Sequence, residues 1–343
     1  MIIASALLGA GALVGFAWRA LWVANWLVAK GYSTASRLCL RWVAPSVFKE
    51  LTLLTCDLIE GQTDAGLARV EGLLACLPQS SDTWRLLISN TLCNVLINAG
   101  RYREALALRR GLRTTMRACP SSEPSGLIVV NAVEALYNLG RWRAAERICT
   151  SALEQNGYSG LALEGMRVQL AWIYARTARP DDAEALLAVT SGSRFPVLYR
   201  SEVHFTLAAV ALSRGECGAA LRCVEQGARL AKRASSKRNA EFLRAEILFA
   251  RGDLQAAEDA FRRGAQSVYR AQGGASLALW ADCLVALGRP DEASRVAKLV
   301  VERDPQSEAA AKRAKHTSRT RAFDAVVEPG PPPVLQDALV GDM

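Results

Sequence analysis

The sequence predicts an all-α protein, a solenoid of about seven helical hairpins behind an N-terminal transmembrane helix. Three observations lead to this prediction. Hydrophobic residues make up 51% of the chain but aromatic residues only 7%, so Ala and Leu dominate, which favours helices over sheet. A motif of small residues recurs every 36 to 40 residues through the body. The first 30 residues contain a long stretch that is almost free of charge.

The N-terminal stretch, residues 2–29, contains a single charged residue, Arg19. It exceeds the ~20 residues that a helix needs to cross a bilayer, so we expect a single-pass transmembrane anchor over residues 1–30. A cleaved secretory signal is the main alternative, although the stretch lacks a basic beginning and its apolar part is long. A soluble helix that caps the repeats is a second alternative.

Side chains suited to the membrane surface stand at the end of this span. Indole rings favour the headgroup region, and long basic side chains reach the same level. The residues of these two types are Trp18, Arg19, Trp22, Trp26 and Lys30. The three tryptophans are spaced four residues apart and therefore share one helix face.

A pair of small residues lies earlier in the span. Gly11 and Gly15 form a small-x-x-x-small pattern, which lets a neighbouring membrane helix approach closely. Such patterns are common in apolar segments by chance. We therefore treat association through the transmembrane helix as a secondary expectation.

The charge after the span sets the expected orientation. No basic residue precedes the span, whereas Lys30, Arg37, Arg41 and Lys49 follow it. Because basic flanks remain on the cytoplasmic side, the body of the protein is expected in the cytoplasm. We accordingly predict a basic juxtamembrane segment over residues 31–46.

The rest of the chain repeats one motif, a small residue followed five positions later by Ala or Gly. The seven pairs are Gly61/Gly66, Gly100/Ala105, Gly140/Ala145, Ala178/Ala183, Gly215/Ala220, Gly252/Ala257 and Gly288/Ala293. The first residue ends one helix tightly, and the second lets the next helix pack closely against it. Each unit is thus expected to be a helical hairpin, and seven exceed the ~3 repeats that a stacked core needs.

The residues around these turns resemble the tetratricopeptide repeat, a unit of about 34 residues. LINAGRYREALAL and LFARGDLQAAEDAF match its Leu-x-x-x-Gly turn and the Ala early in its second helix. Pro78 and Pro305 stand where that family often closes the second helix. The resemblance covers about residues 47–310, and the intervals in this chain are longer than the family's.

The resemblance implies a superhelix whose first helices line a concave, partner-binding surface. Aligning the units on their turn residues selects the positions on that surface. The partner-binding candidates are Asn90, Asn94, Asn131, Glu134, Gln169 and Trp172. The same alignment makes the surface of the later units apolar or acidic, with Phe205, Phe242, Leu243, Glu246 and Asp282. Amide side chains both donate and accept hydrogen bonds, so the Asn residues suit a peptide backbone.

Two of these residues match a known binding device of the family. Asn94 and Asn131 correspond to the two Asn of the carboxylate clamp with which some members hold chaperone tails. The cationic positions of that clamp are Asn90, Gly165 and Gln169 here. Without cations a C-terminal carboxylate has little to hold it, so chaperone-tail binding is not expected. Ordinary polar residues on an exposed helix face are the alternative interpretation.

The sequence carries no sign of catalysis. It has none of the phosphate-binding, serine-nucleophile or zinc-protease motifs. Nine cysteines without a C-x-x-C pair indicate a reducing compartment, and two histidines, His204 and His316, provide no metal-site spacing. We therefore expect a protein without enzyme activity, cofactor or metal.

The net charge of +9 is spread along the chain rather than concentrated. A basic strip, Lys232, Arg233, Lys237 and Arg238, is expected to be a solvated loop between hairpins. It lacks interleaved aromatic residues, which disfavours nucleic acid as a partner. Residues 311–343, basic at first and then acidic and rich in proline, are expected to be a flexible tail.

Together these expectations describe a membrane-anchored scaffold that faces the cytoplasm and binds partner proteins or peptides on its concave face. The alternative is an assembly factor or accessory subunit of a membrane enzyme complex. Haem-biosynthesis-associated membrane proteins, for example, also join an N-terminal span to such repeats, although this comparison rests on the fold alone.

Overall fold

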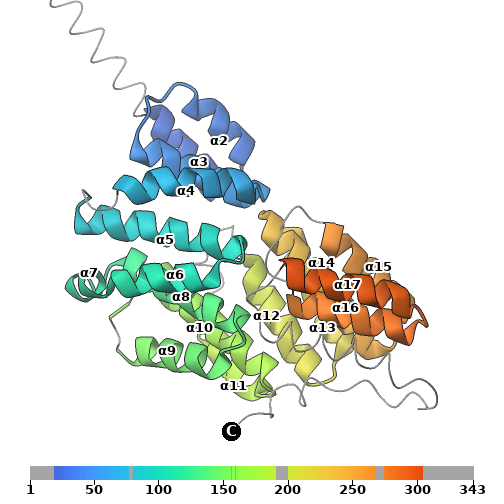
Figure 1. Cartoon of the computed structure of the whole chain (residues 1–343). Coiled ribbons are helices and arrows are strands. Elements are labelled where there is room, and N and C mark those ends of the chain that lie inside the picture. The colour runs from blue at the N-terminus through green and yellow to red at the C-terminus, as the bar shows by residue number, and fades with distance from the viewer. Residues whose placement is uncertain are drawn as a thin grey trace, which may run out of the picture.

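The computed structural model describes residues 19–76, 80–155, 157–158, 160–190, 200–266 and 274–303, where every regular element is a helix (Figure 1). The helices pair in sequence as hairpins. The pairs are α3 (Val47–Glu60) with α4 (Thr63–Cys76), α5 (Asp82–Asn98) with α6 (Tyr102–Gly111), α8 (Glu123–Asn138) with α9 (Trp142–Glu154), α10 (Gly160–Arg176) with α11 (Pro180–Ala188), α12 (Arg200–Ser213) with α13 (Cys217–Leu230), α14 (Ala234–Arg251) with α15 (Leu254–Gln266), and α16 (Gly274–Ala286) with α17 (Pro290–Arg303). A short helix, α7 (Arg113–Ala118), follows α6. The predicted all-α solenoid of helical hairpins is confirmed.

The seven turn residues predicted from the repeat all adopt the left-handed backbone region. Their φ values run from 58° at Ala178 to 88° at Gly252. Six of the seven are glycine, which enters this region without strain, whereas Ala178 does so at a cost of about 1 kcal/mol. The residue five positions further on is buried in every unit, so the second helix lies close against the first.

The structure contains one further hairpin, which we call the N-terminal hairpin. It pairs a helix over residues 19–29 with α2 (Ser33–Leu40). Gly31 joins the two with a φ of 83°, and Ser36, five positions later, is fully buried. This unit was missed from the sequence because Ser stands where the other units have Ala or Gly, and because a membrane span was expected over the same residues.

The first helix of the N-terminal hairpin packs its apolar face onto the array. Leu21, Ala24 and Val28 are buried against α2, α3 and the turn after α2. Across the part of the chain that the structure describes, no helix has the length and apolar character needed to cross a membrane. Residues 1–18, which include Gly11, Gly15 and Trp18, lie outside the described residues, as does the predicted tail over residues 311–343. The predicted span therefore stays a prediction.

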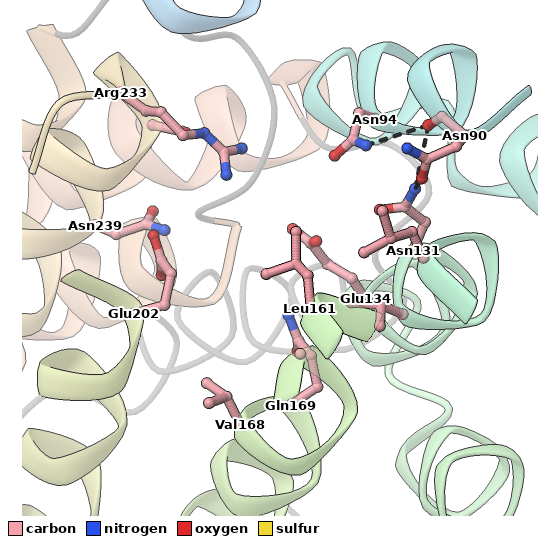
Figure 2. A pocket seen from close by; sticks show the side chains of 14 residues that line it. Asn90, Asn94, Asn131, Glu134, Leu161, Val168, Gln169, Glu202, Arg233 and Asn239 are labelled. Atoms are coloured by element: carbon pink, nitrogen blue, oxygen red, sulfur yellow. Dashed lines mark hydrogen bonds between the residues drawn. The ribbon is translucent and has the colours of Figure 1, made fainter. Parts of the chain in front are cut away.

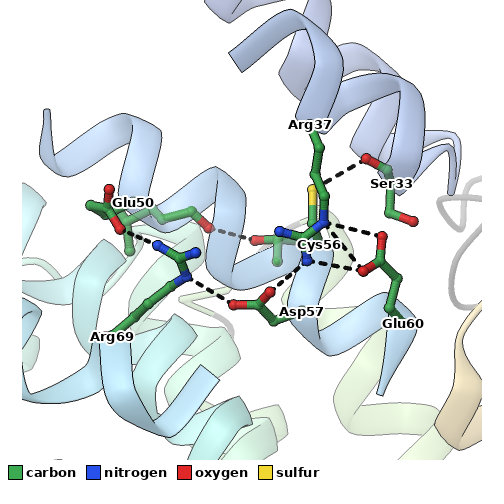
Figure 3. Close-up of polar contacts among 9 residues, drawn as sticks. Ser33, Arg37, Glu50, Cys56, Asp57, Glu60 and Arg69 are labelled. Carbon is green, nitrogen blue, oxygen red and sulfur yellow. Dashed lines mark hydrogen bonds and ion pairs between the residues drawn. The ribbon is translucent and has the colours of Figure 1, made fainter. Parts of the chain in front are cut away.

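A network of ion pairs fixes the N-terminal hairpin to the next one (Figure 3). Arg37 of α2 donates to Asp57 of α3 at 2.5 Å and to Glu60 at 3.0 Å. Arg69 of α4 donates to the other oxygen of Asp57 at 3.0 Å and to Glu50 at 2.6 Å. Asp57 is only 1% exposed, so losing either arginine would leave a buried carboxylate oxygen without its partner. The network joins α2, α3 and α4 into one unit.

The hydrophobic core runs along the array between the first and second helices. One apolar cluster joins α3, α4 and α5, a second joins α8, α9 and α10, and a third joins α14 to α17. Each hairpin thus buries its apolar face against its neighbours, as stacked repeats must. The array is also curled, because α14, near the C-terminal end of the stack, contacts α3 near the N-terminal end.

A buried ion pair stabilises this curl. Arg176 at the end of α10 donates through Nη1 to Oε2 of Glu246 in α14 at 2.6 Å, and both side chains are 7% exposed. Ser276 of α16 donates to the other carboxylate oxygen at 2.8 Å. Burial lowers the pKa of Arg176, but the adjacent Glu246 carboxylate outweighs it, so the pKa lies above its ordinary value and the arginine stays protonated. The pair therefore links three first helices, α10, α14 and α16.

The eight cysteines whose side chains the structure describes are free thiols, and four of them are buried. Burial raises the pKa of Cys93, Cys149 and Cys283 to about 12. When folding raises the pKa of a thiol, the unfolded state loses that proton at a lower pH than the folded state does. Stability should therefore fall as the pH rises above the thiol's unfolded pKa, by at most about 1.4 kcal/mol per thiol and pH unit.

We expect Cys93, Cys149 and Cys283 to resist alkylation by iodoacetamide at pH 8 in the native protein, because few thiolates form there and access is closed. Mass spectrometry of the labelled peptides measures this. Cys217, which is partly exposed, is the internal control and should react first. Equal labelling rates for Cys93 and Cys217 would contradict the structure.

Candidate functional site

A cavity lies on the concave side of the array (Figure 2). One wall comes from α5, α8 and α10, and the other comes from α12 and the start of α14. The cavity holds about 780 Å³ of space, part of it open to solvent. Every helix that lines it is the first helix of its hairpin. It therefore occupies the surface on which the repeat pattern placed partner binding.

Five of the six partner-binding candidates meet in this cavity. They are Asn90, Asn94, Asn131, Glu134 and Gln169. Three successive first helices bring them together, because each candidate stands at an equivalent place in its own repeat.

Trp172, the sixth candidate, does not line the cavity. Its ring packs edge-on against Tyr137 with the ring centres 6.4 Å apart, and the guanidinium of Arg176 lies 5.6 Å from its centre. A cation over an indole face is held electrostatically. Trp172 thus supports the buried arginine rather than the cavity surface.

The three asparagines form a hydrogen-bonded group across two helices. Nδ2 of Asn131 in α8 donates to the backbone oxygen of Asn90 at 3.2 Å and to its Oδ1 at 2.9 Å. Nδ2 of Asn94 donates to the same backbone oxygen at 3.1 Å. Asn131 is 5% exposed, so its NH₂ group is used within the protein and orients Asn90. In the hydrogen bonds of the described residues, the Asn90 NH₂ group and the Asn94 Oδ1 remain available to a ligand.

Charged side chains stand on the opposite wall. Figure 2 shows Glu202, Arg233 and Asn239 facing the helices that carry the asparagines and Glu134. Oε1 of Glu202 accepts a hydrogen bond from the Ser236 hydroxyl at 2.6 Å, which fixes the carboxylate at the cavity edge. The cavity therefore offers amide groups on one wall and both signs of charge around them.

Arg233 belongs to the basic strip that was expected to be a solvated loop. That expectation was wrong, because α14 begins at Ala234 and takes up the rest of the strip. Arg238 is 4% exposed, with its guanidinium 5.7 Å from the ring centre of Phe242. Lys237 is exposed, whereas Arg233 lines the cavity. The sequence could not indicate that Arg233 lines the cavity, since α5 and α8 lie far from it along the chain.

The apolar concave surface expected in the later units is closed. Phe205, Phe242, Leu243 and Glu246 are at most 7% exposed and pack between helices. Phe205 packs against Gly227 of α13 and Phe242 against Gly264 of α15, so these positions make contacts within their own hairpins instead of forming an open surface. The expectation that Phe205, Phe242, Leu243 and Glu246 form an apolar or acidic part of the concave surface was therefore wrong.

The fold and the cavity define a class of protein, a helical-hairpin solenoid with a polar chamber on its concave face. Residues 248–315 match the tetratricopeptide repeat family model. The resemblance to the tetratricopeptide repeat that the turn residues predicted is confirmed over this part of the chain. No curated protein matches the chain.

Solved structures with the same fold cover most of the chain. A chain in the crystal structure of the APC/C hetero-tetramer Cut9-Hcn1 has a TM-score of 0.56 and 11% identity over 87% of this chain, which spans 55% of its length. The Rap protein complexed with Competence and Sporulation Factor has a TM-score of 0.54 and 10% identity, covering 89% of this chain and 98% of that one. NprR in complex with its cognate peptide NprX has a TM-score of 0.52 and 14% identity, covering 81% and 84%. At these identities the likeness shows the fold alone.

Proposed function

We propose that the chain is an adaptor that binds an extended peptide segment of a partner protein in its concave cavity. The observation that carries this proposal is the meeting of Asn90, Asn94, Glu134 and Gln169 from three repeats in one cavity. Amide side chains pair with the donors and acceptors of a peptide backbone whatever its sequence. The NprR structure with its cognate peptide supports the proposal as an example of the fold with such a ligand.

The charge of the cavity suits a peptide segment with charged side chains. Glu134 and Glu202 offer acceptors to a basic side chain, and Arg233 offers a donor to an acidic one. The backbone of the ligand would lie along the asparagine group, with its side chains reaching the charged wall.

The second part of the proposal is attachment to a membrane, with the repeats in the cytoplasm. Residues 2–18 carry no charged side chain, and their 17 positions reach the lower end of the ~17–25 residues that cross a bilayer. The described helix over residues 19–29 packs on the array, so we now place the end of the proposed span before it. The basic residues that follow the span support the cytoplasmic orientation.

Replacing Asn94 by Ala tests the peptide-binding part. A library of random linear peptides would first be selected on the full-length protein, and the affinity of the best binder measured by fluorescence anisotropy. We expect the variant to bind it about 5- to 30-fold more weakly, because one or two hydrogen bonds to the backbone are lost.

Asn138→Ala is the matched control. Asn138 makes the same kind of bond as Asn94, from its Nδ2 to the backbone oxygen four residues earlier, but lies outside the cavity lining. The Asn138→Ala variant should bind the selected peptide with the same affinity as the wild type. Equal binding by all three proteins would contradict the proposed site.

An assembly factor or accessory subunit of a membrane enzyme complex is the second candidate. The likeness to a chain of the Cut9-Hcn1 hetero-tetramer favours it, since that fold sits in a multi-subunit assembly. Crosslinking in intact membranes separates the two candidates. A single complex of constant composition that Asn94→Ala does not disturb supports the subunit, whereas loss of crosslinked partners in this variant supports the adaptor.

A further inference from the structure

The exposed large hydrophobic side chains are concentrated in the N-terminal hairpin and the turn after it. Of the ten in the described part of the chain, six lie between residues 22 and 42. They are Trp22, Val23, Trp26, Tyr32, Leu38 and Trp42. Soluble proteins rarely leave so many large apolar groups together in water unless the surface has a partner.

Two tryptophans define the outer face of the first helix in this hairpin. Trp22 and Trp26 are one turn apart and are 68% and 51% exposed, on the side away from the buried Leu21 and Ala24. Packing therefore fixes the orientation of this helix. The face that carries Leu21 and Ala24 already contacts the array, so the tryptophans cannot turn inward.

A third tryptophan joins this surface from the turn after α2. Val43 packs in one cluster with Leu21 and Ala24, which places its neighbour Trp42 beside the same helix. Trp42 is 71% exposed, the highest value among the exposed large hydrophobic residues in the described part of the chain. Indole rings from two segments thus extend into solvent from one end of the array.

Within the segment that carries this surface, the charge has one sign. Residues 19–49 contain five basic residues and no acidic one. Arg37 is engaged by Asp57 and Glu60, and Nζ of Lys49 donates to the backbone oxygen of Val43 at 2.6 Å. The other three basic residues, Arg19, Lys30 and Arg41, are exposed. A segment that presents indoles and exposed cations, and has no acidic residue of its own, complements the headgroup region of an anionic bilayer.

We infer that the outer face of the N-terminal hairpin binds the surface of an anionic lipid bilayer. Trp22, Trp26 and Trp42 enter the headgroup region, and Arg19, Lys30 and Arg41 contact lipid phosphates. This inference extends the membrane part of the proposed function and is independent of the peptide-binding part. Because Arg37 and Asp57 fix the hairpin to the array, lipid binding also sets the orientation of the cavity relative to the membrane.

Tryptophan quenching by brominated lipids tests the inference with the full-length protein in vesicles. The vesicles contain phosphatidylcholine and about one third phosphatidylserine, with bromine near the headgroup end of the acyl chains. The signal of Trp42 is the difference between wild type and Trp42→Phe. Trp142→Phe is the control, since Trp142 is partly exposed on α9 and packs against Tyr137, away from the N-terminal hairpin.

We expect the Trp42 signal to be quenched about two-fold or more, and the Trp142 signal to be unchanged. Without phosphatidylserine, or in an Arg41→Glu/Lys30→Glu variant, the quenching of Trp42 should largely disappear. An unquenched Trp42 would overturn the inference. Trp42 fluorescence that is blue-shifted but not quenched would also overturn the inference. It would show that a protein, or a second copy of this chain, covers the surface.

Two further measurements keep the proposals separate. Flotation of the vesicles after alkaline washing reports the proposed span, because a helix that crosses the bilayer resists extraction. If the protein floats with the vesicles while Trp42 stays unquenched, the lipid-binding surface is contradicted and the transmembrane anchor is supported. Binding of the selected peptide reports the cavity alone, since Trp42 is not part of its lining.

Discussion

Replacing Glu246 by Ala is expected to lower the free energy of unfolding by about 3–5 kcal/mol. The substitution leaves Arg176, 7% exposed, charged in the interior without its carboxylate partner, and deprives Ser276 of its acceptor. Urea unfolding followed by circular dichroism measures the change by linear extrapolation. Because the pair links α10 to α14, the walls of the cavity should loosen as well, so affinity for a selected peptide falls together with stability.

Two controls distinguish this result from a general effect of losing an ion pair. Glu104→Ala removes an exposed pair with Arg101, in which the side chains are 45% and 51% exposed, and should cost less than about 1 kcal/mol. The double variant Arg176→Met/Glu246→Leu replaces the buried charges with apolar groups and should recover most of the loss, within about 2 kcal/mol of the wild type. Similar losses for Glu246→Ala and Glu104→Ala would contradict the importance of the buried pair.

Replacing Gly126 by Ala is expected to destabilise the protein by about 1–3 kcal/mol, although Ala is normally the better helix former. A Cβ at this position would overlap Cβ of Ala162 and lie 2.9 Å from Cδ1 of Tyr158. The first of these atoms cannot swing away, so α8 and α10 must separate. Both helices carry cavity residues, and peptide affinity should therefore decrease too.

Gly72→Ala is the matched control for this prediction. Gly72 lies inside α4, and a Cβ there would meet nothing within 4 Å. The variant should gain up to about 1 kcal/mol of stability from helix propensity alone. The two substitutions thus have opposite expected signs in the same unfolding measurement, and a stabilising Gly126→Ala would show that the packing of α8 on α10 is looser than described.

Much of the fold followed from local sequence. Gly61, Gly100 and Ala178 could be recognised as turn residues because a tight helix end needs a small side chain, and each adopts a positive φ. Alignment on these turns also selected Asn90 and Asn131 as neighbours on the concave side, although 41 residues separate them. Equivalent positions in stacked repeats lie side by side whatever the partner is, which is why this part of the cavity was predictable.

The N-terminal hairpin shows what local patterns cannot decide. A stretch with one charge over residues 2–29 satisfies the length criterion for a span, yet Leu21, Ala24 and Val28 are buried against the repeats. An apolar helix face that packs on protein and one that packs on lipid have the same composition. Only the presence of α2 and α3 as packing partners distinguishes the two, and Gly31 with Ser36 was the signal that could have revealed it.

The sequence by itself determined the hairpins, their turns and the face that each first helix presents, because these depend on residues a few positions apart. The tertiary structure alone decided which of those faces remain open. Phe205 and Phe242 were buried against Gly227 and Gly264, in the second helices of their own hairpins. Glu202 and Arg233 came to the cavity through the curl that brings α14 to α3. That curl is the sum of small rotations between hairpins, set by side-chain volumes and by contacts such as Arg176 with Glu246, 70 residues apart.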